Sequence, residues 1–95
     1  MKNFIERAIT EVQIAETKRV DLTPAPEGWH AETKSNMHVF VIMKAYILGN
    51  EKAYLSSNAE GAPIYEVTYN LATDDIYFVT YTQTAKETIY VGGDK

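Results

Sequence analysis

The chain has no cysteine, and this absence excludes several kinds of chemistry at once. Disulfide bridges, thiolate metal sites and a cysteine nucleophile all require that residue. Proline and glycine are also few, with three and five residues, so long unstructured linkers are not expected. Apolar residues make up 45% of the chain, which is enough for a folded protein. We therefore predict a single domain over residues 1–95 with one modest core.

Positive charge is sparse and dispersed. Nine basic residues face thirteen acidic ones, the net charge is −4, and only Lys18 and Arg19 are adjacent. A phosphate-binding surface needs clustered lysine and arginine, so direct nucleic-acid binding is not expected. Because Glu6 and Arg7 follow closely after Met1 where a signal peptide needs an apolar run, no export signal is expected. The most apolar stretch, 37–48, contains His38 and Lys44 and is too short to cross a bilayer. We predict a soluble, cytoplasmic protein that does not bind membranes.

Recognisable catalytic patterns are missing. The two histidines, His30 and His38, lack the spacing of metal ligands. Ser56-Ser57 has no nucleophile-elbow context, and turn chemistry accounts for Asp74-Asp75. No phosphate-binding loop, dinucleotide fingerprint or calcium loop occurs. The sequence therefore predicts no enzyme activity, no metal site and no cofactor.

One amphipathic helix is predicted at residues 3–17. Asn3 and Glu6 have capping-box spacing. A single apolar stripe follows, made of Phe4, Ile5, Ala8, Ile9, Val12 and Ala15. The competing interpretation of its end is a strand, because Val12/Ile14 and Val20/Leu22 alternate. Residues 18–36 are expected to form an irregular connection, since Pro24 and Pro26 prevent a long regular element; Thr23-Pro24 could begin a short helical turn.

The rest of the chain predicts an antiparallel sheet over 37–91, followed by a tail at 92–95. Stretch 37–48 is apolar on both faces at period two, which is typical of an interior strand covered on both sides. Further strands are expected at 52–57, 64–71, 76–84 and 88–91, separated by turn residues. The predicted fold class is α+β, with one N-terminal helix packed on a four- to five-stranded antiparallel meander. This order is similar in architecture to cystatin-like and other helix-grip domains. The Gln-x-Val-x-Gly loop of cystatins is absent, so the resemblance implies no site residues and no activity.

Aromatic residues supply the candidate contacts. Four tyrosines occupy odd positions of two neighbouring predicted strands, so we expect them on one face: Tyr65, Tyr69, Tyr77 and Tyr81. Either the helix packs on that face, or the rings form an amphipathic binding platform. Trp29, in the irregular connection, is either a lid on the core or a contact anchor.

The leading functional hypothesis is a module that binds another protein stoichiometrically, such as an inhibitor, an immunity protein or a phage-encoded antagonist. Its expected contact residues are Trp29, Phe40, Tyr46, Tyr65, Tyr69, Tyr77 and Tyr81. A homodimer through a sheet face or the edge of the last strand would use the same surplus of apolar surface. One alternative is a binder of a small anionic molecule, in a pocket between helix and sheet lined by Phe40, Ile42, Tyr46 and Trp29. His38 or Lys44 would be its polar contact. A further alternative is a structural subunit of a larger assembly.

Overall fold

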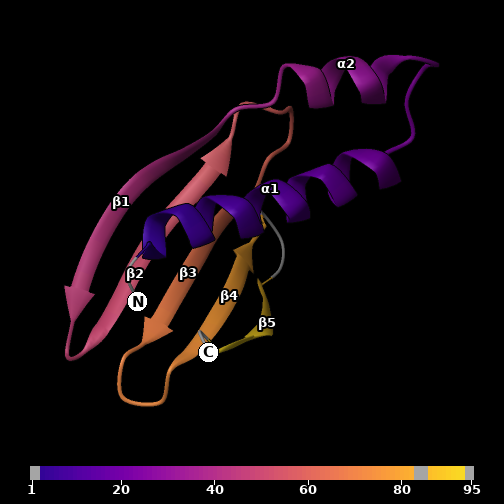
Figure 1. Ribbon diagram of the computed structural model, residues 1–95. Helices are drawn as coiled ribbons and strands as arrows, with labels where there is room; N and C mark the ends of the chain where they lie inside the picture. Colours follow the sequence, from indigo (N-terminus) through magenta and orange to yellow (C-terminus); the bar gives the residue numbers. More distant parts are fainter. Residues whose placement is uncertain (1–2, 83–85, 94–95) are drawn as a thin grey trace.

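The computed structural model describes residues 3–82 and 86–93, which form two helices and one antiparallel sheet (Figure 1). The helices are α1 (Phe4–Leu22) and α2 (Trp29–Ser35). The strands are β1 (Val39–Ile47), β2 (Asn50–Ser57), β3 (Ile64–Asn70), β4 (Asp75–Tyr81) and β5 (Lys86–Gly93). They lie in the order β1-β2-β3-β4-β5, and each strand pairs antiparallel with the next. This confirms the predicted α+β fold with an N-terminal helix on an antiparallel meander.

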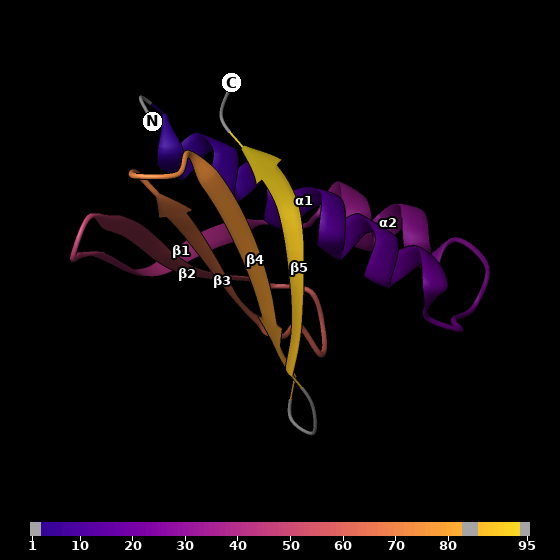
Figure 2. The same cartoon turned by 90° about the horizontal axis from the view of Figure 1, so that it is seen from below.

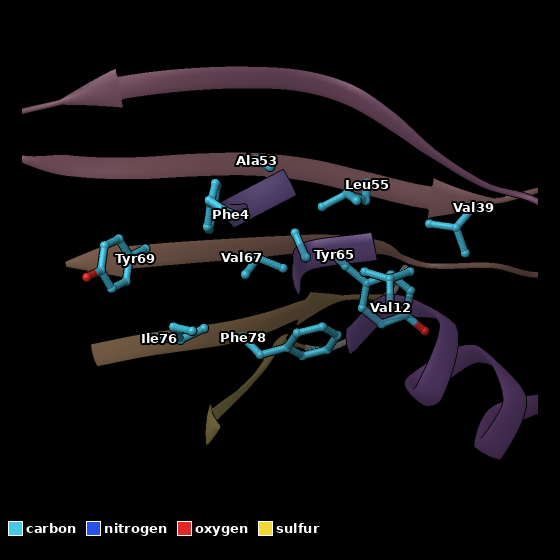
Figure 3. Close-up of a cluster of buried hydrophobic side chains, with 11 residues drawn as sticks. Phe4, Val12, Val39, Ala53, Leu55, Tyr65, Val67, Tyr69, Ile76 and Phe78 are labelled. Carbon is cyan, nitrogen blue, oxygen red and sulfur yellow. The ribbon is translucent and has the colours of Figure 1, made fainter. Parts of the chain in front are cut away.

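Helix α1 packs across one face of the sheet, where it contacts β1, β2 and β3 (Figures 1 and 2). Its buried residues recur at every fourth position: Phe4, Ala8, Val12, Glu16 and Val20. This spacing places them on one side of the helix. Phe4, Ala8 and Val12 meet inward-pointing side chains of the strands in one core cluster, which Figure 3 shows: Val39, Ala53, Leu55, Tyr65, Val67, Tyr69, Ile76 and Phe78. This cluster lies between α1 and the sheet.

The predicted boundaries of the first 36 residues are wrong in part. Helix α1 continues to Leu22 instead of ending at residue 17, and the connection predicted to be irregular contains α2. The predicted apolar stripe ended at Ala15, but the buried side of the helix continues through the acid Glu16 to Val20. The expected capping box is not formed, because the Asn3 side chain makes no cap hydrogen bond. Helix α2 begins after Gly28, whose φ of 85° is readily adopted only by glycine.

The predicted end of the sheet also needs correction. Strand β5 reaches Gly93, so residues 92 and 93 belong to the sheet and not to a tail. Strand β4 ends at Tyr81, before the predicted boundary at 84, and Lys86 and Glu87 belong to β5 instead of a turn. Residues 83–85 and 94–95 lie outside the described residues.

Strand β1 is not an interior strand, contrary to the prediction. It occupies one edge of the sheet and pairs only with β2. Only its first residue, Val39, is buried, at 8% exposed; every later residue of the strand is partly or largely exposed, including Ile47 at 51%. The reason is the chain order: in a meander the first strand lies at an edge, and α1 crosses closer to the middle of the sheet (Figure 1).

Candidate functional site

The sheet has one face that no helix of the described residues covers (Figure 2). Residues paired across antiparallel strands share a face, so the register assigns the side chains that point away from α1. On β2, β3 and β4 they are Lys52, Tyr54, Ser56, Ile64, Glu66, Thr68, Tyr77, Val79 and Tyr81, and on β1 they include Phe40, Met43, Ala45 and Ile47. We call this surface the open face.

A carboxylate lies at the centre of the open face. Glu66 is opposite Tyr54 of β2 and Val79 of β4. It accepts hydrogen bonds from the hydroxyls of Tyr81 at 2.7 Å and Tyr54 at 2.8 Å, and from Lys52 Nζ at 3.0 Å. Only 6% of Glu66 is exposed. No helix shields this residue, so its burial comes from the neighbouring side chains that close around it.

These contacts set the ionisation of the cluster. Burial acts to raise the pKa of Glu66, but the hydrogen bonds from Tyr81, Lys52 and Tyr54 outweigh it and leave the pKa below its ordinary value. The same bonds raise the pKa of the Tyr54 and Tyr81 hydroxyls, because each phenol donates to a carboxylate and would lose that bond on ionising. The centre of the open face is thus a carboxylate neutralised by Lys52 and flanked by neutral tyrosines.

Apolar side chains surround this centre. Ile64 is 45% and Tyr77 is 39% exposed on the open face, and Phe40 is 40% exposed at its β1 margin. Exposed apolar side chains that gather on one surface can mark an interaction site. The open face is therefore apolar and tyrosine-rich, and its central charges are paired.

The four tyrosines do not share a face, so that prediction is wrong. In the register of β3 and β4, Tyr65 pairs with Thr80 and Tyr69 pairs with Ile76, so odd positions of one strand face even positions of the other. Tyr65 and Tyr69 consequently point toward α1 and are 2% and 5% exposed. Their hydroxyls donate to Glu16 and Asp74 respectively, both at 2.5 Å. Tyr77 and Tyr81 lie on the open face, where a contact role stays a prediction.

The predicted ligand pocket is wrong, because its residues do not come together. Where α1 contacts β1, β2 and β3, the space between helix and sheet is filled by the core. Phe40 lies on the open face, Ile42 and Tyr46 are exposed on the edge strand, and His38 and Lys44 are exposed as well. Other hollows are present, and two of them bear on this prediction. One, of about 200 Å³, lies between α1 and the last two strands and includes Ile14 and Val91.

Trp29 lines the second hollow, which is shallow and has a volume of about 450 Å³. Its walls also include Pro24, Pro26, Glu60 and Gly61, together with Arg19. The indole is half-buried at the start of α2 and meets the ring of His30 edge-on, with centroids 5.4 Å apart. His30 Nε2 lies 2.6 Å from the carbonyl oxygen of Thr23. Trp29 therefore packs at the junction of the two helices and does not cover the main core.

Sequence reasoning missed a second buried carboxylate, Glu16. Its two oxygens accept bonds from Arg19 Nε at 2.6 Å and Nη2 at 3.0 Å, from Ser57 Oγ at 2.5 Å and from the Tyr65 hydroxyl at 2.5 Å. Burial acts to raise the pKa of Glu16, but the bonds from Arg19, Ser57 and Tyr65 leave it below its ordinary value. The signal that could have found it is an acid on the apolar stripe, three residues before an arginine.

Neither carboxylate cluster resembles a metal centre. Across 3–82 and 86–93, no three histidine, aspartate or glutamate side chains gather where they could hold a metal ion. Neither of the two described helices has the length and apolar character needed to cross a membrane.

Comparison with known proteins gives one match. A family described as a "Family of unknown function (DUF6275)" matches residues 9–91. No curated protein and no solved structure matches the chain. The matched segment runs from the second turn of α1 through Val91 of β5, and so it covers most of the helix and sheet described above. The chain therefore belongs to the DUF6275 family.

Proposed function

We propose that this chain is a protein-binding module, which acts by stoichiometric binding of another protein through the open face. One observation carries the proposal: an uncovered sheet face has exposed apolar side chains around a centre whose charges are already paired. The carboxylate of Glu66 is saturated by three donors, and Lys52 supplies the compensating charge.

This arrangement has the composition of a protein interface. The fully buried part of such interfaces is poor in unpaired charge and rich in tyrosine. Tyr54, Tyr77 and Tyr81 offer apolar ring area on a rigid strand scaffold, and the bonds to Glu66 fix two of the rings before any partner arrives. Binding of this type needs no catalytic group. It suits an inhibitor, an immunity protein or an antagonist, and such a role in the cytoplasm stays a prediction.

The alternative of a small anionic ligand stays a prediction with weaker support. The hollow beside Trp29 falls within the usual volume range of ligand sites, roughly 300–1,000 Å³. Its cation, however, is already engaged: Arg19 binds Glu16 through two nitrogens and donates through Nη1 to the carbonyl oxygen of Glu60 at 3.1 Å. We therefore favour the open face.

A pull-down with matched variants tests the proposal. The baits are the tagged wild-type chain, the double variant Ile64→Ser/Tyr77→Ser, and the control Leu22→Ser, which alters an 83% exposed residue at the end of α1. We expect the wild type and the control to capture one stoichiometric protein that survives high-salt washing. Because central contact residues each contribute more than about 1 kcal/mol, the double variant should capture at least tenfold less.

The double variant must remain folded for this comparison to hold, and its circular dichroism melting curve checks this. Equal capture by the double variant and the wild type would contradict the assignment of the open face. Capture of no protein by any bait would remove the proposed function itself.

A further inference from the structure

The outer edge of β1 is a second surface, distinct from the open face. Within the described residues, β1 pairs with β2 on one side and with no strand on the other. Four large apolar residues in its second half, and Leu48 in the turn that follows, are 51% to 96% exposed: Ile42, Met43, Tyr46, Ile47 and Leu48. Long apolar edge strands are normally shortened, charged or covered, because their free N–H and C=O groups recruit other strands. This edge has one charge, Lys44, and one bulge.

The bulge divides β1 into two parts with different side-chain orientation. Val41 pairs with Leu55 and Met43 with Tyr54, which leaves Ile42 as the extra residue. Beyond it the strand is regular, and the register places alternate residues on the two faces. Met43, Ala45 and Ile47 lie on the open face, whereas Lys44 and Tyr46 lie on the side of α1. This regular part, Met43–Ile47, is as long as an average strand.

The regular part of β1 is complementary to an antiparallel copy of itself. When Ala45 of one copy lies opposite Ala45 of the other, Met43 lies opposite Ile47, and Lys44 lies opposite Tyr46. Every facing pair then shares a sheet face, as antiparallel pairing requires. No lysine faces a lysine in this register. The single charged side chain of this edge, Lys44, therefore causes no repulsion between the two copies.

We propose that two copies of this chain pair through the outer edge of β1, antiparallel and centred on Ala45, to form one continuous ten-stranded sheet. The contact is isologous, with a two-fold axis through Ala45 perpendicular to the sheet, and it closes after two copies. It is independent of the proposed function, because it uses the strand edge and not the open face.

Charge and area both fit a second copy. In this register, Lys44 of one copy faces Tyr46 of the other copy. Tyr46 pairs in turn with Glu51 of its own β2, so Lys44 and Glu51 lie on either side of Tyr46. Glu51 Oε2 is buried and has no hydrogen-bond partner among the described residues. In the proposed dimer, Lys44 of the second copy would extend over Tyr46 toward this carboxylate. A standard interface removes about 800 Å² from each partner. The backbone edge and five large apolar side chains that are more than half exposed, four in β1 and one in the turn after it, are available to contribute to such an area.

The helices do not obstruct this contact. Helix α2 lies at the Val39 end of β1, away from the turn that joins β1 to β2 (Figure 1). When the pairing is centred on Ala45, the two copies overlap at the ends of β1 that lie next to this turn. The helix α2 of each copy then lies at the far end of its own β1, away from the contact. With the two-fold axis perpendicular to the sheet, both copies keep their helices on one side. The two open faces then lie next to each other on the other side.

A charge exchange tests both the contact and its register. We expect the wild-type mass to rise with concentration in sedimentation velocity, from 10.7 kDa toward twice that value. Tyr46→Lys places a lysine opposite Lys44 in both halves of the contact and should raise the dissociation constant at least tenfold. Lys44→Glu/Tyr46→Lys places opposite charges there and should restore the dimer. Both positions are exposed, so these variants should keep the wild-type melting curve.

Oxidative cross-linking tests the register directly, because the chain has no cysteine of its own. Ala45→Cys should form a disulfide between copies, since facing residues of antiparallel strands lie about 4.5–5.5 Å apart. In the matched control Ile47→Cys, the two thiols lie four residues apart along the strands, roughly 13 Å, and should not join.

Three results would overturn the proposal. The first is a monomer at every concentration, and the second is a dimer that tolerates Tyr46→Lys. The third is a disulfide at Ile47→Cys that forms as readily as at Ala45→Cys.

If the chain stays monomeric and Tyr46→Lys abolishes capture in the pull-down, the edge binds a strand of another protein instead. Ile64→Ser/Tyr77→Ser should leave the dimer intact, so failure of the open face and failure of the edge are distinguishable.

Discussion

At the scale of single residues, the protein has two buried glutamates with similar partners, one on each face of the sheet. Glu16 lies on the side of α1 that faces the sheet, and Glu66 lies on the open face. Each is neutralised by a nearby cation and accepts hydrogen bonds from hydroxyl donors. A buried carboxylate is costly unless its oxygens are fully hydrogen-bonded. Glu16 meets this condition with donors from β2, β3 and its own helix, so it ties the second half of α1 to the sheet.

Replacing Tyr65 with phenylalanine tests this tie. Tyr65→Phe keeps the ring in the core and removes only the hydroxyl that donates to Glu16. Because a buried carboxylate oxygen then lacks one partner, we expect a loss of about 1–3 kcal/mol in the free energy of unfolding. Urea denaturation measures the loss.

Tyr46→Phe is the matched control for that measurement. Tyr46 is 67% exposed, so removal of its hydroxyl should change stability by less than about 0.5 kcal/mol. This control should be measured at a concentration where the chain is monomeric. Equal effects of the two substitutions would show that the Tyr65 hydroxyl contributes nothing to the attachment of α1.

At the scale of elements, the sheet buries one side of α1 and leaves the other side exposed. Val12 is fully buried, whereas Ile14 on the other side of the helix is 46% exposed. Val12→Ala should therefore cost about 1–3 kcal/mol, from lost burial and the cavity left behind. Ile14→Ala removes more atoms but should cost clearly less. Thermal and urea denaturation of both variants check the order, and the reverse order would mean that α1 presents a different face to the sheet.

The helix, the meander and most of the core could be predicted from the sequence. Hydrophobic periodicity defines α1 up to Glu16, where a charge on the apolar stripe ends the recognisable pattern. Its compensation by Arg19, Ser57 and Tyr65 depends on β2 and β3, which lie more than forty residues away along the chain. A partner at that distance is invisible to any local pattern.

The candidate site could be predicted only in part, because the missing facts concern register. The faces of Tyr65 and Tyr77 depend on whether odd positions of β3 meet odd or even positions of β4, and one residue of register exchanges the faces. In β1, the extra residue Ile42 reverses the alternation halfway along the strand. Residues on both faces of the apolar run 37–48 are apolar, which predicts an interior strand covered on both sides. Whether the strand lies inside the sheet or at its edge depends on strand order, which the local pattern does not contain.

At the scale of the whole molecule, the described residues form two layers, and their helices cover one face of the sheet and leave the other open (Figure 2). The helix layer and the core account for stability on that side. On the other side, Glu66 and its partners keep the sheet face ordered without a covering element. If two copies join at β1, their two open faces lie side by side on the same side of one sheet, and neither layer changes. The proposed dimer would in this way double the area of the proposed binding surface.

The two carboxylate clusters predict how the whole fold responds to acid. Glu16 and Glu66 have pKa values below the ordinary value of 4.5 in the folded chain. Below that pH, the unfolded chain takes up protons that the folded chain does not, so protons favour unfolding. Their stabilisation is complete above pH 4.5 and is lost as the pH falls through the lower pKa values of the folded state.

We therefore expect the free energy of unfolding to fall with acid, each glutamate contributing a slope of up to about 1.4 kcal/mol per pH unit. Urea denaturation between pH 3 and pH 7 measures the slope. Glu66→Gln removes one titrating group and leaves a side chain of the same shape, so its curve should be less stable near pH 7 and flatter below pH 4.5. Glu60→Gln, at an exposed position, is the control and should follow the wild type. A Glu66→Gln curve parallel to the wild type at every pH would mean that the bonds from Tyr54, Tyr81 and Lys52 do not favour the ionised form of Glu66, and that the ordered centre of the open face has another cause.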